Sequence, residues 1–135
     1  NYLNFRDLGV IKENKVVKLN KYFLHDLLNF LEDKKITVAY SNPVISEQGY
    51  YFSGGKINMN EFSSSLSFNL NKRGKSFASP DFAIIAKDKH AITYHNFLKE
   101  KEIDHKTAIV SDYQIFWDFS GSQIEINRLR SLIPY

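Results

Sequence analysis

Two stretches of the sequence carry polar groups at a spacing that suits a binding cleft. The first, Glu61 to Ser67, reads Glu-Phe-Ser-Ser-Ser-Leu-Ser, and the second is Gln123-Ile124-Glu125 near the C-terminus. Both are predicted to be strands, in which successive side chains point to opposite faces. Serine hydroxyls would then share one face of the first strand, while Gln123 and Glu125 would share a face of the second. If the two strands lie side by side, hydroxyls, an amide and a carboxylate line one polar cleft. A functional hypothesis depends on this pairing and on Arg6 near the start.

The composition predicts one folded domain spanning residues 1–135. Hydrophobic residues make up 43% of the chain and aromatic residues 15%, which is enough for a core that buries roughly two thirds of the unfolded surface. No run approaches the roughly 18 apolar residues of a membrane helix, so we expect no membrane span. The first residues lack a signal-peptide pattern and a Met, so we expect a trimmed chain whose export signal, where it has one, lies outside it.

Charge and cysteine content exclude several kinds of chemistry. The chain has no cysteine, which rules out disulfides, zinc–thiolate sites and thiol catalysis. No spacing of His, Asp and Glu resembles a metal motif, so we expect no metal. The net charge of +3 is mild. Its densest basic cluster, residues 72–75 (Lys-Arg-Gly-Lys), is interpreted as a solvated turn, with nucleic-acid contact as the alternative.

The clearest predicted element is a helix from Lys21 to Asp33. Asn20 is a suitable N-cap, and the lysines after the helix suit the negative end of its dipole. The apolar residues at helical spacing that would form its buried stripe are Phe23, Leu24, Leu27, Leu28 and Leu31.

Strand patterns dominate the rest of the chain. Gly54-Gly55 predicts a two-residue hairpin that pairs Phe52 with Ile57. The near-continuous apolar run from Asp81 to Ala86 indicates a central strand. Asn96 would cap a short helix, Phe97 to Glu102. The other expected strands are Tyr2 to Leu8, Ile36 to Tyr40, Phe62 to Leu70, Ala91 to Tyr94, Thr107 to Val110 and Tyr113 to Phe119. The expected fold is α+β, with mostly antiparallel, twisted strands arranged as split sheets around a cleft, and one long and one short helix.

The last predicted strand, Gln123 to Asn127, has an alternative. Gly121-Ser122 would make a turn that pairs it with the preceding strand, and Glu125 would then face Asp118, a like-charge pair that disfavours the hairpin unless a function uses it. However, Ser122 to Glu125 also fits a Ser-x-x-Glu capping box, which would make residues 123–133 a helix. Both remain open from the sequence, and the strand is the interpretation adopted here.

The order of these parts resembles the mono-ADP-ribosyltransferase toxins of the cholera and pertussis type. That family has an aromatic-Arg pair on its first strand, a hydrophobic-Ser-Thr-Ser-hydrophobic-Ser strand and a late Gln/Glu-x-Glu. Here these are Phe5-Arg6, residues 62–67 (Phe-Ser-Ser-Ser-Leu-Ser), in which Ser64 stands where threonine is usual, and Gln123-Ile124-Glu125. The resemblance covers the chain in outline and about a dozen residues in detail, and the chain is short for the family.

The resemblance implies an enzyme that cleaves nicotinamide from NAD and transfers ADP-ribose to a macromolecular acceptor, a protein or a nucleic acid. A carboxylate beside the ribose would stabilise the oxocarbenium-like charge that develops in the transition state. The implied roles are catalysis for Glu125, Gln123 and Ser63, NAD binding for Arg6, Ser65 and Phe77, and acceptor recognition for Trp117 and Phe119. The family further implies a toxin or effector that is secreted or delivered into a target cell and acts in its cytosol, with an immunity or carrier protein as a possible partner.

Two other functions fit the same residues. Exposed aromatic side chains, expected at Tyr22, Tyr40, Tyr51 and Trp117, would suit a non-enzymatic protein-binding module of the immunity or inhibitor type. A metal-independent RNase that uses the basic loop is the third hypothesis.

Overall fold

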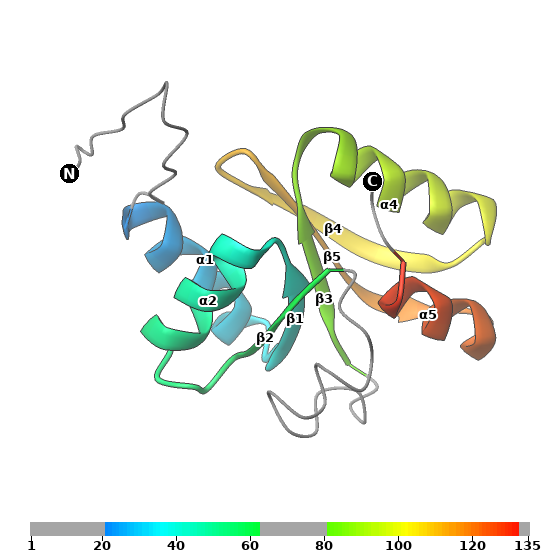
Figure 1. The fold of residues 1–135 in the computed structure, drawn as a ribbon. Coiled ribbons are helices and arrows are strands. Elements are labelled where there is room, and N and C mark those ends of the chain that lie inside the picture. The colour runs from blue at the N-terminus through cyan, green and yellow to red at the C-terminus, as the bar shows by residue number, and fades with distance from the viewer. Residues whose placement is uncertain (1–20, 63–80, 133–135) are drawn as a thin grey trace.

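The computed structural model describes residues 21–62 and 81–132 of the chain (Figure 1). The described helices are α1 (Lys21–Asp33), α2 (Pro43–Phe52), α4 (Asp88–Glu100) and α5 (Gln123–Arg130). The strands are β1 (Val38–Ser41), β2 (Asn58–Glu61), β3 (Ala83–Ala86), β4 (Asp104–Val110) and β5 (Tyr113–Ser120).

The strands form one mixed sheet in the order β2-β1-β3-β5-β4. β1 is parallel to β2 and to β3, whereas β5 is antiparallel to β3 and to β4. The predicted α+β class is therefore confirmed, but the mostly antiparallel arrangement is wrong. In the described part of the chain the strands belong to a single sheet rather than to split sheets. The prediction of one long and one short helix is also wrong, because α1 and α4 have 13 residues each and α2 and α5 add two more helices.

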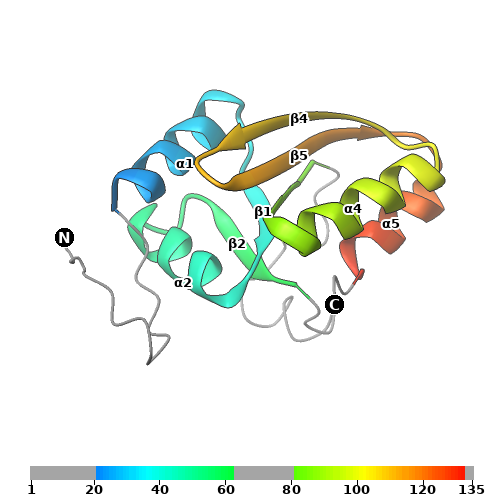
Figure 2. The ribbon, with the colours of Figure 1, turned by 90° about the horizontal axis from the view of Figure 1, so that it is seen from above.

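Helices cover both faces of the sheet. Figures 1 and 2 show α1 and α2 on one side and α4 and α5 on the other. The core follows this division, because alternate residues of each strand join opposite clusters: Ala39 packs with α1 and α2, whereas Tyr40 packs with α4 and α5. All four residues of β3 are buried, which confirms the prediction of a central strand.

Helix α1 has the predicted bounds, Lys21–Asp33. The way in which it ends accounts for the left-handed backbone of Lys35. Lys35 has a left-handed backbone with φ of 61°, and the N–H of Ile36 donates to the carbonyl of Leu31 at 2.8 Å. Glu102, with φ of 55°, takes the same place after α4 and is followed by buried Ile103. Both helices thus end in a Schellman motif, in which an apolar residue after the left-handed position packs on the last turn.

The predicted hairpin around Gly54-Gly55 is wrong. Residues 43–52 form α2, and β2 runs parallel to β1 instead of pairing with the preceding segment. Gly54 and Gly55 have positive φ values of 67° and 79°, so they reverse the chain after a helix rather than within a hairpin.

The signal for α2 is its start, Asn42-Pro43. The Asn42 side-chain oxygen accepts a hydrogen bond from the N–H of Ile45 at 2.9 Å, and Pro43 occupies the first turn. Asparagine as N-cap followed by proline is a typical helix start. Gly49 then allows α2 to lie close to β2, because a Cβ there would be 3.1 Å from Met59 Cε.

A buried serine ties α2 to the sheet. The Ser46 hydroxyl lies 2.8 Å from the carbonyl of Asn60 and 3.3 Å from that of Ser41, and the Ser41 hydroxyl donates to the carbonyl of Ile85 at 2.9 Å. All three parallel strands therefore share this polar network beneath the first turn of α2.

The strand predicted at Ala91 to Tyr94 is also wrong, because these residues lie in α4. Ala91, Tyr94 and Leu98 are buried at helical spacing. Asn96, predicted to cap a short helix, lies in the interior of α4. Four residues with alternating size are too few to distinguish a strand from a buried helix face.

A bulge at Asp118 changes the face to which β5 side chains point. Tyr113 and Trp117 pack toward α1 as the predicted alternation requires, but Phe119 packs with Phe82 on the face of α4 and α5, at 4.8 Å between ring centroids. The β4–β5 register shifts between Asp104 and Lys106, and Asp118 has φ of 60°. An extra residue in one strand turns every later side chain to the other face.

Candidate functional site

Part of the predicted NAD cleft lies outside the residues that the structure describes. Arg6, Ser63, Ser65 and Phe77 lie outside the described residues. The meeting of Arg6, Ser63 and Glu125 in one cleft therefore stays a prediction.

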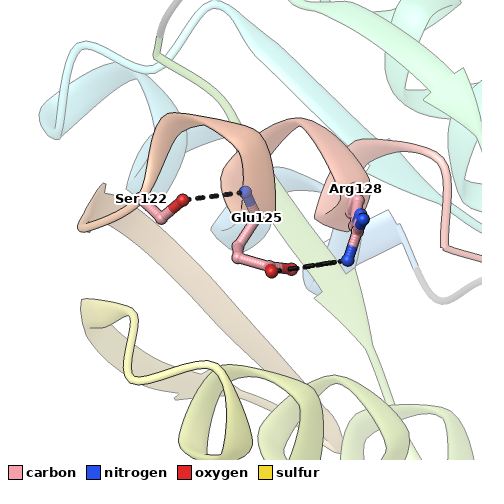
Figure 3. Close-up of polar contacts among 3 residues, drawn as sticks. All are labelled: Ser122, Glu125 and Arg128. Atoms are coloured by element: carbon pink, nitrogen blue, oxygen red, sulfur yellow. Dashed lines mark hydrogen bonds and ion pairs between the residues drawn. The ribbon is translucent and has the colours of Figure 1, made fainter.

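The predicted strand that carries Gln123 and Glu125 is wrong, because these residues begin α5. Figure 3 shows Glu125 on this helix with Ser122 and Arg128. The Ser122 hydroxyl accepts a hydrogen bond from the N–H of Glu125 at 3.4 Å, so the N-cap of the capping-box alternative is confirmed. Glu125 pairs with Arg128 one turn later, at 3.4 Å between Nη1 and Oε2. Gln123 donates to the side chain of Asn127 at 3.2 Å along the same helix. Both side chains thus have partners within α5.

The two aromatic residues assigned to acceptor recognition lie on opposite faces of the sheet. Trp117 is partly exposed and packs edge-to-face on Phe30 of α1. Phe119 is partly buried against Phe82. Of the aromatics expected to be exposed, Tyr22 and Tyr51 are 70% and 74% exposed, but Tyr40 is buried at 2%. Burial raises the pKa of Tyr40 to about 12, against the weaker opposing effect of Arg130.

The fold points to a different site, at the carboxyl ends of β1 and β3. These parallel neighbours continue in opposite directions: β1 leads through α2 to β2, and β3 leads through α4 to the far side of the sheet. In open α/β sheets, ligands bind at such a reversal of strand order. A cavity of about 210 Å³ lies there, lined by Asn42 after β1, Phe62 after β2, Ala86 at the end of β3 and residues 87–90 after it. We call it the carboxyl-edge crevice.

Two side chains that line the crevice, Asn42 and Lys87, are both in contact with Tyr113. The Asn42 amide donates to the Tyr113 hydroxyl at 3.2 Å, and Tyr113 stacks on Phe23 of α1 at 5.1 Å. The Lys87 ammonium lies 5.2 Å from the centre of the Tyr113 ring. This cation–π contact holds an exposed lysine at the mouth of the cavity.

The rest of the lining comes from Phe62 and the start of α4. The His90 ring stands perpendicular to the Phe62 ring at 6.2 Å, and Phe62 packs on Tyr94 at 5.3 Å. Asp88, the first residue of α4, has a left-handed φ of 56°. Lys87, the N-cap residue, makes no side-chain hydrogen bond to the first turn in the described part of the chain.

The crevice has a positive electrostatic bias. Lys87 and Lys89 bring two positive charges and Asp88 one negative charge. The helices α2 and α4 both begin at this edge, and a helix N-terminus attracts anions. The arrangement can therefore hold a small anion.

Sequence reasoning missed Asn42, Lys87 and His90. The expected strands Ile36 to Tyr40, Asp81 to Ala86 and Ala91 to Tyr94 leave these three residues in the connections between strands. The signal that would have found them is the alternation of short apolar strands with helix starts, which predicts parallel strands and a site at their carboxyl ends.

Among the described residues, no group of three His, Asp or Glu side chains is arranged to hold a metal ion. The helices of residues 21–62 and 81–132 are all too short or too polar to cross a membrane. Comparisons of the chain with protein-family models, curated proteins and solved structures found no significant match.

Proposed function

We propose that the protein binds a small phosphorylated molecule in the carboxyl-edge crevice. The observation that carries this proposal is that Lys87 and His90 both line a cavity at the switch point of the sheet, each in contact with an aromatic ring. A lysine ammonium is a common point-charge ligand for phosphate. Because aromatic contacts already hold both side chains, binding costs little side-chain ordering.

The size of the cavity limits the ligand. Ligand pockets in proteins usually span about 300–1,000 Å³, and the crevice measures about 210 Å³. It therefore suits a phosphate or pyrophosphate group with a small attached part, rather than a whole dinucleotide.

Calorimetric titration of the full chain with pyrophosphate tests the proposal. We expect Lys87→Ala to weaken binding about tenfold, since a hydrogen bond to a charged group contributes about 1.5–3 kcal/mol. Lys99→Ala is the matched control, because it removes an exposed lysine from the last turn of the same helix. Asp88→Asn should strengthen binding by removing the negative charge, and asparagine tolerates the left-handed backbone. Absence of binding by the wild type, or equal affinities in Lys87→Ala and Lys99→Ala, would refute the proposal.

The ADP-ribosyltransferase activity remains a separate proposal that rests on the sequence resemblance alone. Its test is NAD turnover by the purified protein and by Glu125→Ala, with several acceptor extracts. The pairing of Glu125 with Arg128 within α5 is the reason why we place this activity second. The protein-binding alternative is favoured only by the exposure of Tyr22 and Tyr51, and co-purification with a partner would test it.

A further inference from the structure

A second cavity lies at the opposite edge of the sheet, beside the amino ends of β1 and β3. It measures about 360 Å³, which falls within the usual range for small-molecule sites, about 300–1,000 Å³. Its walls come from the end of α1, the segment before β3 and the middle of the β4–β5 pair. We call it the Trp117 pocket. The residues that line it include Lys34, Lys35, Phe82, Lys106, Trp117 and Asp118.

The aromatic wall of this pocket is held by a ring contact and by strand pairing. Trp117 is partly exposed, and its ring meets Phe30 edge-to-face at 5.1 Å and 84°. Its backbone is fixed between β3 and β4, opposite Ala83 and Lys106. A tryptophan held in this way offers a planar ring to a ligand at little entropic cost.

The charged wall has an excess of lysines. Lys106 and Asp118 form an ion pair at 3.3 Å, because the bulge at Asp118 turns its side chain toward β4. That pair leaves Lys34 and Lys35 as the main positive charges of the pocket, with Asp81 as the remaining acid in its lining. Lys34 also lies 5.8 Å from the centre of the Phe30 ring, which itself packs against Trp117.

We propose that the Trp117 pocket binds a mononucleotide, with its base against Trp117 and its phosphate between Lys34 and Lys35. Stacking of a base on an aromatic side chain and contact of its phosphate with ammonium groups are the usual components of such recognition. A pocket of 360 Å³ holds one nucleotide but not a longer strand. This inference does not depend on the ligand of the carboxyl-edge crevice, which lies at the other edge of the sheet.

Trp117 is the only tryptophan in the chain, so its fluorescence reports on this pocket alone. We expect AMP to change the emission of the wild type in a saturable way. Adenosine, which lacks the phosphate, and ribose 5-phosphate, which lacks the base, should each bind about tenfold more weakly or worse.

Substitutions test whether AMP binds in the Trp117 pocket. The double variant Lys34→Ala/Lys35→Ala should weaken AMP binding about tenfold, whereas the matched Lys99→Ala should leave it unchanged. Trp117→Phe should also weaken AMP binding, which is measured by calorimetry in this variant because it has lost the fluorescent side chain. An emission that AMP does not alter would overturn the proposal. Binding that persists in the double variant and is lost in Lys87→Ala would place the nucleotide in the carboxyl-edge crevice and likewise overturn it.

Discussion

Two substitutions of Asn42 separate its structural role from its effect on the ligand. Asn42 caps α2 through its side-chain oxygen and donates its amide to the Tyr113 hydroxyl, while it also lines the carboxyl-edge crevice. Asn42→Ala removes both bonds. An N-cap contributes about 1 kcal/mol and a neutral hydrogen bond about 0.5–1.5 kcal/mol. We therefore expect the free energy of unfolding to fall by about 2 kcal/mol.

Asn42→Asp keeps both contacts, because a carboxylate still caps the helix and can accept a hydrogen bond from the Tyr113 hydroxyl. A negative charge at a helix N-terminus is itself favourable by about 0.3–1 kcal/mol. The unfolding free energy should therefore stay within about 0.5 kcal/mol of the wild type.

The same aspartate should weaken phosphate binding. A sphere of about 210 Å³ is about 7 Å across, so a phosphate of charge about −2 would lie roughly that far from the new carboxylate. Even at the dielectric constant of water, their repulsion is about 1 kcal/mol, or about a fivefold loss of affinity.

Urea unfolding and pyrophosphate titration measure the two effects in the same preparations. Ser122→Ala is the control for the cap, since its hydrogen bond is longer, at 3.4 Å, and exposed. Ser122→Ala should lower the free energy of unfolding by less than Asn42→Ala does, and it should leave pyrophosphate binding unchanged. If Asn42→Asp binds pyrophosphate as tightly as the wild type does, the ligand does not occupy the crevice. If Asn42→Ala unfolds like the wild type, the assignment of the cap is wrong.

Three further predictions concern stability and are measured by urea unfolding. Lys35→Gly and Glu102→Gly should each raise the free energy of unfolding by about 1 kcal/mol, because glycine relieves the left-handed strain; a loss of stability in both would contradict the Schellman assignment. Ser46→Ala should cost about 1–2 kcal/mol, since it removes the hydroxyl that donates to the buried Asn60 carbonyl at 2.8 Å, and an unchanged midpoint would refute that role. Burial raises the pKa of Tyr40 to about 12 from 10.0, so the folded state holds this proton more tightly than the unfolded state does. The stability that the folded protein gains from holding this proton is complete below pH 10 and is lost as the pH rises toward 12. The loss in the free energy of unfolding is about 1.4 kcal/mol at pH 11. Tyr40→Phe should lose correspondingly less stability between pH 8 and pH 11, and an equal loss would count against it.

The sequence predicted best those elements whose signal is local and long. The apolar stripe of α1 identifies the helix, and the apolar runs of β3 and β5 identify strands, of which β3 is fully buried. The partner of each strand could not be predicted in the same way, because parallel pairing joins segments that are separated by a whole helix. Once α2 was interpreted as half of a hairpin, β2 had to be antiparallel, and the crevice between β1 and β3 could not be foreseen.

The C-terminal segment shows how two local patterns compete. As a strand paired with β5, it would have placed Glu125 opposite Asp118, two like charges in contact. As a helix, it places Glu125 in the first turn, where its charge is favourable, and gives it Arg128 as a partner one turn later. Ser122 adds a cap. Three favourable local terms thus oppose one unfavourable pair, and the helix forms. For Glu125 to act on NAD, its ion pair with Arg128 would have to open, whereas Lys87 and His90 already line a cavity.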